Sequence, residues 1–188
     1  MINIVDNFLK DHIYQEVYHN LLHNKFEEVE VGDKKFWVQY SNQLFDKHIV
    51  EKLSEIDGVQ RECLLGFFRI ATEEFDTDWR IHADSKVGDI RPERALVLYI
   101  SPSTKEGLHG TAFWKHKDVG YEMPLNVSSE EADRFLMKEA NNLDNWDLHS
   151  VVGYRPNRAL MYPSNYFHSK YPNTGWKEGR MVYVMFYR

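Results

Sequence analysis

The sequence predicts a mainly β protein with flanking helices, in which two antiparallel sheets form a jelly roll. From residue 64 onward the chain consists of short β-rich runs separated by turns, without the alternating strands and helices of βαβ units. Aromatic residues make up 14% of the 188 residues, which favours a β-rich core over a helical bundle. No internal repeat or Pro/Gly-rich linker divides the chain, so we expect a single domain over residues 1–188.

The first 60 residues are expected to form a helical support for the jelly-roll core of residues 61–188. Apolar residues recur at helical spacing over residues 8–23 and again over residues 44–57. Gly58 follows the second segment, where a left-handed C-cap is expected. Residues 35–40 form a predicted strand between the two helices. The apolar positions of the two helices are Leu9, Ile13, Val17 and Leu21, then Leu44, Ile49, Leu53 and Ile56.

Eight short strands are predicted in the core. They cover residues 64–71, 79–84, 94–101, 111–116, 149–154, 158–162, 166–171 and 180–187. A predicted helix at 128–143, capped by Ser128 or Ser129, lies in an insertion of about 118–150. The insertion is long enough to act as a lid. Its apolar residues could equally pack a helix on the outside of a sheet.

Composition restricts the classes of function. The formal net charge is -6 and the sequence pI is about 5.8, so nothing favours nucleic acid as a partner. The sequence contains neither a secretory h-region nor an apolar stretch of membrane-spanning length. The single cysteine, Cys63, cannot form an intramolecular disulfide, which suits a reducing compartment. We therefore expect a cytoplasmic protein that makes no use of a membrane.

The residues that point to chemistry begin with His82 and Asp84. Residues i and i+2 of a strand point to the same face, so both side chains could bind one ion. Two imidazoles and one carboxylate are the ligands of the facial triad that holds non-haem Fe(II). The spacing alone is weak evidence, because His116 and Asp118 match it too. The second pair is expected in a more solvated setting past its strand, and it is the weaker candidate.

A third ligand is predicted from hairpin geometry. His168 and Arg180 are placed symmetrically about residue 174, within the turn sequence of residues 172–175. A hairpin there would bring the two side chains nearly opposite each other on strands about 4.8 Å apart. The guanidinium could then receive the far carboxylate of a dicarboxylic co-substrate. Taken singly, His168 could instead be a structural histidine and Arg180 a surface residue.

The ordered series of these elements resembles the Fe(II)- and 2-oxoglutarate-dependent dioxygenases, in the branch of the prolyl 4-hydroxylases. The segments that carry the resemblance are residues 4–9, 82–84, 96–100, 110–113, 156–162, 168 and 179–180. More narrowly, residues 111–117 and the helical insertion resemble phage and marine bacterial members of unassigned substrate.

The resemblance implies a double-stranded β-helix with a catalytic iron bound by His82, Asp84 and His168. Arg180 would bind the C5 carboxylate of 2-oxoglutarate. The reaction would convert 2-oxoglutarate and dioxygen to succinate and carbon dioxide while hydroxylating an unknown substrate. Retention of Asp84 favours hydroxylation over halogenation, because the halogenating enzymes lack this carboxylate.

Two departures from the family pattern affect the co-substrate site. Many relatives carry Ser or Thr two positions after the arginine, where this chain has Val182. Prolyl hydroxylases also place a tyrosine before the metal strand, where residues 69–71 read Arg-Ile-Ala. Tyr99 or Tyr162 is expected to supply the missing hydroxyl.

Other interpretations stay open from the sequence. Tyr166, Phe167 and Trp176 lie near the predicted hairpin and could contact substrate, although core aromatics are more common. The chain could also be a non-catalytic jelly-roll protein that binds a metal or small ligand. A third alternative is a structural or host-interaction protein whose histidines are incidental.

Overall fold

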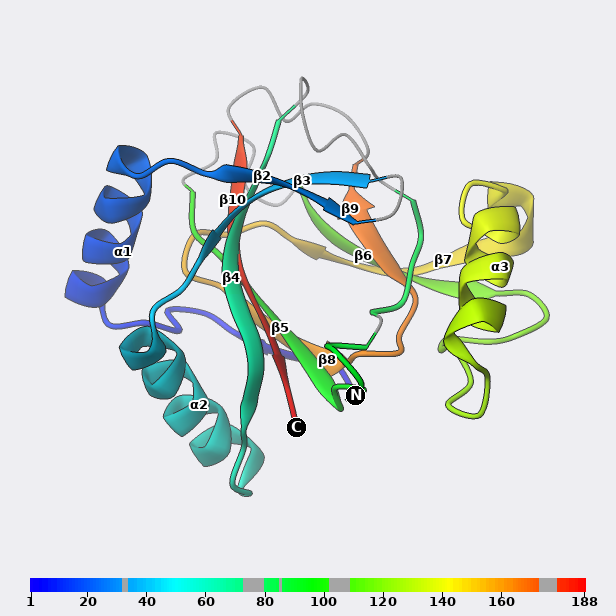
Figure 1. The fold of residues 1–188 in the computed structure, drawn as a ribbon, viewed down its shortest axis with the longest axis horizontal. Helices are drawn as coiled ribbons and strands as arrows, with labels where there is room; N and C mark the ends of the chain where they lie inside the picture. The colour runs from blue at the N-terminus through cyan, green and yellow to red at the C-terminus, as the bar shows by residue number, and fades with distance from the viewer. Residues whose placement is uncertain (32–33, 73–79, 85, 102–108, 173–178) are drawn as a thin grey trace.

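The computed structural model describes residues 1–31, 34–72, 80–84, 86–101, 109–172 and 179–188. It is mostly β, with few helices and two antiparallel sheets that face each other (Figure 1). The large sheet has seven strands in the order β1-β8-β5-β10-β4-β3-β2, and the small sheet has the order β7-β6-β9. The large-sheet strands are β1 (Asn3–Val5), β2 (Glu27–Val31), β3 (Lys34–Tyr40), β4 (Cys63–Ala71), β5 (Arg94–Tyr99), β8 (Ala159–Pro163) and β10 (Arg180–Tyr187). The small-sheet strands are β6 (Gly110–His116), β7 (Trp146–Gly153) and β9 (His168–Tyr171).

The helices cover opposite sides of this pair of sheets (Figure 1). Helices α1 (Asp11–His23) and α2 (Gln43–Asp57) lie beside the large sheet, and α3 (Ser129–Glu139) lies beyond the small sheet. A short 3-10 helix, η1 (Leu143–Asn145), leads into β7. Within the described ranges, no helix is both long and apolar enough to span a bilayer.

Two of the expected helix ends, at Gly58 and at Ser128, form where the sequence predicts them. Asn42 caps α2 by accepting a hydrogen bond from the Phe45 amide, and Gly58 ends α2 with a left-handed φ of 71°. Ser128 caps α3 in a capping box with Glu131. Of the two expected caps for this helix, Ser128 is therefore the one used.

Apolar side chains fill both faces of the large sheet. One cluster joins the sheet to α1 and α2 through Leu21, Ile49 and Leu53, which are at most 4% exposed. A second cluster lies between the sheets and includes Tyr99 and Phe113. Of the four apolar positions expected on the buried face of α2, Ile49 and Leu53 are buried, whereas Leu44 is 82% exposed and Ile56 is 38% exposed. Leu9, expected inside the first helix, precedes α1 and is buried.

Several expectations about the elements are wrong. Residues 1–60 are more than a helical support, because β1, β2 and β3 join the large sheet. The strand expected at 79–84 is reduced to one bridging residue, His82; Trp79 lies outside the described residues. The expected hairpin is also wrong, because β9 pairs with β6 and β10 lies between β5 and β4 in the other sheet. Its turn at 173–175, and Trp176, lie outside the described residues.

Candidate metal centre

His82, Asp84 and His168 meet between the ends of the sheets. Their ligand atoms all lie within 4.8 Å of one another. His168 opens β9, and His82 pairs with it through two backbone hydrogen bonds of 2.9 and 2.8 Å. This single antiparallel bridge sets the two imidazole rings side by side, with centroids 4.3 Å apart. The predicted cluster is therefore assembled without the predicted strand.

Backbone hydrogen bonds also position Asp84. Its amide donates to the Ser164 carbonyl at 2.8 Å, in the connection between β8 and β9. Its carboxylate oxygen Oδ1 lies 3.7 Å from His168 Nε2, while Oδ2 is buried and has no hydrogen-bond partner in the described part of the chain. A buried acceptor without a donor is costly unless a cation satisfies it. This oxygen fits a metal ligand.

The tautomers of both histidines follow from their contacts. His82 Nδ1 lies 2.9 Å from the Arg80 carbonyl, and His168 Nδ1 lies 2.9 Å from the Tyr166 carbonyl. A carbonyl oxygen only accepts, so both Nδ1 atoms carry the proton and both lone pairs are on Nε2. This outer hydrogen bond is the usual way in which a ligating histidine is oriented. Two Nε2 atoms and one carboxylate form the donor set of a facial triad.

A tyrosine completes the surroundings of His168. The Tyr162 hydroxyl donates to His168 Nε2 at 3.2 Å, because the other ring nitrogen already donates. Burial, the Asp84 charge and Tyr99 raise the pKa of Tyr162, so its phenol stays protonated. Burial also raises the pKa of Asp84, whereas the neighbouring His168 and Arg69 act in the opposite direction. A bound cation would favour the ionised Asp84 carboxylate.

Arg180 lies in the large sheet and is 6% exposed. Its register partner in β4 is Ala71, so it does not stand opposite His168 as expected. Its Nη2 atom donates to Thr111 Oγ1 at 3.4 Å, and its guanidinium lies 5.4 Å from the centre of the Tyr99 ring. The Tyr99 hydroxyl exchanges a hydrogen bond of 2.8 Å with Thr111 Oγ1. Burial raises the pKa of Tyr99, against the opposing charge of Arg180.

Thr111 was not among the predicted site residues. It belongs to β6 of the small sheet, yet its hydroxyl reaches Arg180 and Tyr99 of the large sheet. Val182, at a position where the sequence resemblance led us to expect a hydroxyl, pairs with Tyr99 in the sheet register. The Thr111 hydroxyl of the small sheet therefore lies beside Arg180, whereas β10 places no hydroxyl at residue 182. The sequence does place Thr111 two residues before Phe113, so the two side chains lie on the same face of one strand, and Phe113 lies near His168.

The second His-x-Asp pair is not part of this cluster. His116 is 3% exposed, so the expected solvated setting is wrong for the histidine, whereas Asp118 is exposed. His116 Nδ1 accepts from the amides of Asp118 and Val119 at 3.2 and 3.3 Å. Its Nε2 faces Glu139 of α3 at 3.7 Å. This histidine joins a turn to the inserted helix.

A family model described as a family of unknown function (DUF6445) matches residues 34–175. The chain belongs to this family. No curated protein matches the sequence of this DUF6445 member.

Solved structures resemble this DUF6445 member over nearly all of its length. HygX from Streptomyces hygroscopicus, with nickel, 2-oxoglutarate and hygromycin B bound, has a TM-score of 0.64 at 11% identity, covering 99% of this chain and 82% of HygX. The non-heme alpha ketoglutarate dependent epimerase SnoN from nogalamycin biosynthesis has a TM-score of 0.59 at 12% identity, covering 100% and 77%. A Pseudomonas putida prolyl-4-hydroxylase has a TM-score of 0.56 at 9% identity, covering 100% and 91%. The DUF6445 chain therefore shares the fold of enzymes that use iron and 2-oxoglutarate.

Proposed function

We propose that this protein is an Fe(II)- and 2-oxoglutarate-dependent dioxygenase of the hydroxylating type. The observation that carries the proposal is the cluster of His82, His168 and Asp84, in which both Nδ1 atoms face backbone carbonyls, the ligand atoms lie within 4.8 Å of one another, and Asp84 Oδ2 is buried without a hydrogen-bond partner among the described residues. The fold shared with HygX and the prolyl-4-hydroxylase supports it. On this proposal the chain is one double-stranded β-helix domain of the prolyl 4-hydroxylase-like branch, and it acts in the cytoplasm.

His82, Asp84 and His168 would hold the iron. Iron(II) bound there would supply the redox chemistry with dioxygen that couples conversion of 2-oxoglutarate to succinate with oxidation of a substrate C–H bond. The chain's own part is to hold both Nε2 lone pairs in place through the carbonyls of Arg80 and Tyr166. Tyr162 would release His168 Nε2 on metal binding, and its hydroxyl could then donate to another acceptor at the site.

Arg180 would hold the C5 carboxylate of 2-oxoglutarate. A guanidinium pairs with a carboxylate through two parallel hydrogen bonds, and the Thr111 and Tyr99 hydroxyls stand beside it to add a third. Thr111 and Phe113 lie two positions apart on one face of β6, about 7 Å along the strand. Phe113 reaches the metal end, with its ring centre 6.3 Å from that of His168. That span suits a five-carbon diacid between Arg180 and the metal.

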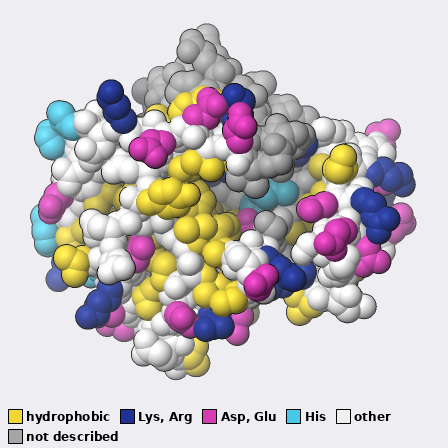
Figure 2. Space-filling model, viewed as in Figure 1, with side chains coloured by type: hydrophobic (Ala, Val, Ile, Leu, Met, Phe, Trp, Pro, Cys, Tyr) yellow, Lys and Arg dark blue, Asp and Glu magenta, His cyan; other side chains and the backbone are white. Residues whose placement is uncertain are grey.

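The primary substrate would meet an apolar surface. Tyr40, Phe67 and Val184 are register neighbours on one face of the large sheet, the face that carries Val182 next to Tyr99. Phe67 and Val184 are half-buried, and Tyr40 is 62% exposed. Figure 2 shows hydrophobic side chains gathered over the centre of the molecule. A small-molecule or protein substrate with an apolar part fits this surface.

The experiment is an anaerobic titration with Fe(II), followed by measurement of succinate formed from 2-oxoglutarate in air. The wild type is expected to bind one equivalent of iron and to form succinate, because these enzymes slowly turn over the co-substrate alone. His82→Ala should lose both properties. His12→Ala, which removes an exposed histidine of α1, is the matched control and should keep them. Iron binding without succinate would favour the non-catalytic metal-binding alternative, and absence of both would refute the proposal.

A further inference from the structure

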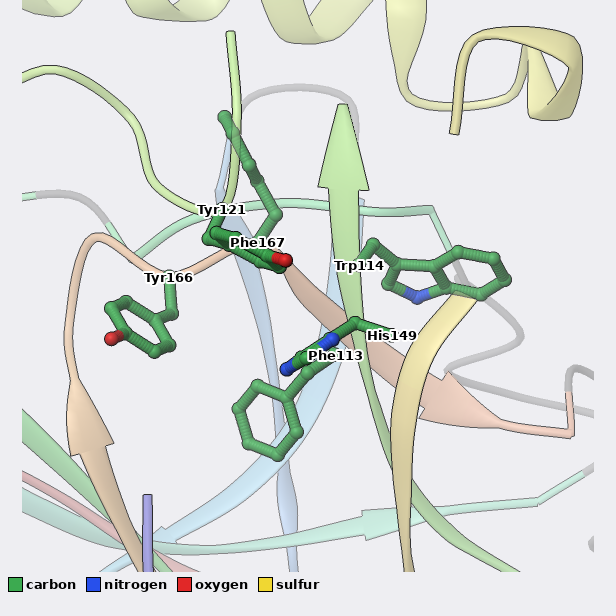
Figure 3. Close-up of a pocket in the computed structure, with 6 residues that line it drawn as sticks. All are labelled: Phe113, Trp114, Tyr121, His149, Tyr166 and Phe167. Carbon is green, nitrogen blue, oxygen red and sulfur yellow. The ribbon is translucent and has the colours of Figure 1, made fainter. Parts of the chain in front are cut away.

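A second binding pocket lies beside the small sheet. It has a volume of about 330 Å³ and is lined by Phe113, Trp114, Tyr121, His149, Tyr166 and Phe167. Figure 3 shows Tyr166 and Trp114 on opposite sides of this group, with His149 and Phe113 between them. The six side chains come from β6, β7, the segment after β6 and the connection into β9. None of the six is one of the metal-binding candidates.

The inner wall of the pocket is preformed. Phe113 and Phe167 are at most 2% exposed. The Phe167 amide donates to the Tyr121 carbonyl at 3.0 Å, and the Trp114 amide donates to the Phe167 carbonyl at 2.9 Å. The Trp114 indole donates to Ser169 Oγ at 2.9 Å, which fixes the plane of its ring. These hydrogen bonds fix the positions of Phe167 and Trp114 before a ligand binds, so binding costs little side-chain entropy.

The rim is polar but electrically balanced. Tyr121 is 44% exposed, and its ring meets His149 edge to face at 4.7 Å. Lys115 Nζ lies 5.5 Å from the centre of the Tyr121 ring. The register partner of Lys115 across the small sheet is Asp147, so this part of the rim carries one residue of each charge. Because the two charges compensate, the rim favours a neutral ligand over an ion.

We propose that this pocket binds a neutral aromatic compound of one or two rings that carries a hydrogen-bonding group, as phenols and indoles do. Three of the lining residues that keep exposed surface, Trp114, Tyr121 and Tyr166, are aromatic, and such side chains select rings through offset and edge-to-face contacts. The Tyr121 and Tyr166 hydroxyls and the His149 imidazole can satisfy the polar group of the ligand. The volume falls at the lower end of small-molecule sites.

The pocket shares a wall with the metal centre. Phe113 packs against Tyr162 and lies near His168, and the Tyr166 carbonyl accepts the hydrogen bond from His168 Nδ1. A bound ring would thus contact two residues that touch a metal-binding candidate, without entering the proposed iron and 2-oxoglutarate site. Binding requires neither iron nor turnover, so this inference can fail or succeed independently of the proposed function.

The test is a titration of the metal-free protein with phenol, followed by ligand-observed NMR. Cyclohexanol is the matched probe, because it has the same size and hydroxyl but no aromatic ring. Phenol should bind saturably, and cyclohexanol should bind about 5-fold more weakly or worse. Tyr121→Ala should weaken phenol binding by about 5-fold through loss of one ring contact. His149→Trp should fill the pocket and abolish binding.

Leu44→Ala is the control variant, because it removes an exposed apolar side chain from α2 and not from the pocket. It should bind phenol like the wild type. Tyr121 and His149 are exposed, so all three variants should keep the wild-type Tm. Equal affinity for cyclohexanol and phenol would overturn the proposed ligand class. Unchanged phenol affinity in both Tyr121→Ala and His149→Trp would overturn the site.

Discussion

The His-x-Asp spacing occurs twice in the chain, and of the two copies only His82 and Asp84 belong, among the described residues, to a cluster that could hold a metal ion. His82 and Asp84 are both turned inward, and His168 joins them within 4.8 Å. His116 is also buried, but Asp118 is exposed and no third ligand lies with this pair in the described part of the chain. Burial of the histidine therefore does not distinguish the two copies.

The difference lies in what each Nδ1 atom contacts. His82 Nδ1 faces a backbone carbonyl and must donate, which leaves its lone pair on Nε2. His116 Nδ1 faces two backbone amides and must accept, so its neutral form carries the proton on Nε2, toward Glu139. In these two histidines the backbone group beside Nδ1 decides which ring nitrogen keeps its lone pair, and a His-x-Asp motif does not reveal that group.

The strongest test of this contrast separates activity from stability. His82→Ala should lower the rate of succinate formation more than about 100-fold, because loss of an outer partner of a metal ligand alone costs 10- to 100-fold. His116→Ala should instead lower the free energy of unfolding by about 2 kcal/mol, since a buried side chain is removed and two backbone amides lose their acceptor. Succinate assays and urea titrations measure both effects. If His116→Ala abolished activity at full stability, the two roles would be reversed.

The sequence predicted those parts of the fold that depend on neighbouring residues. Gly58 and Ser128 end and begin their helices as expected, because a cap is decided within a few residues. The expected pairing of His168 with Arg180 was wrong because a turn sequence does not determine which sheet each flanking strand enters. β9 pairs with β6 and β10 with β4 and β5, and these pairings depend on contacts far along the chain.

The candidate site shows the same division. His82 and Asp84 were predicted from their spacing, and His168 from the family resemblance and from a hairpin that does not form; the structure nevertheless brings the three residues together. Thr111 was missed because its contact with Arg180 crosses from one sheet to the other. Under the proposed function its hydroxyl would take the place of the one missing at Val182, and no local sequence pattern indicates a contact between two sheets.

Besides the metal-binding candidates, the proposed 2-oxoglutarate site includes Arg180. Arg180→Gln should raise the 2-oxoglutarate concentration for half-maximal succinate formation about 30-fold or more, because a buried carboxylate would lose its charged partner. Steady-state kinetics at saturating iron measure this shift. Arg155→Gln, at a half-exposed arginine paired with Asp6, is the control and should leave it unchanged. A fall in Tm with no change in this concentration would make Arg180 a structural residue only.

A smaller effect is expected from Thr111. Thr111→Val keeps the side-chain shape and removes the hydroxyl that Arg180 and Tyr99 share. The same 2-oxoglutarate concentration should rise about 10-fold, the range for one hydrogen bond to a charged group. Iron affinity, measured by anaerobic titration, should stay that of the wild type because Thr111 is not among the metal-binding candidates. An unchanged response to 2-oxoglutarate would remove Thr111 from the site.

The smallest expected effect is a pH dependence of thermal stability that comes from Glu139, the residue that faces His116. Hydrogen bonds from Asn145 and Lys138 lower the pKa of Glu139 to about 2, against an ordinary value of 4.5. A carboxylate with a lowered pKa in the folded state stabilises the fold above pH 4.5, and this contribution is lost as the pH falls from 4.5 toward 2. The wild type should therefore unfold at a higher temperature than Glu139→Gln at pH 6, and the two Tm values should converge near pH 2. Thermal unfolding across that range measures the difference, and iron binding at pH 7 should be the same in both proteins. A difference in Tm that persists unchanged at pH 2 would show that Glu139 acts through packing and that its charge contributes nothing to the anchor around His116.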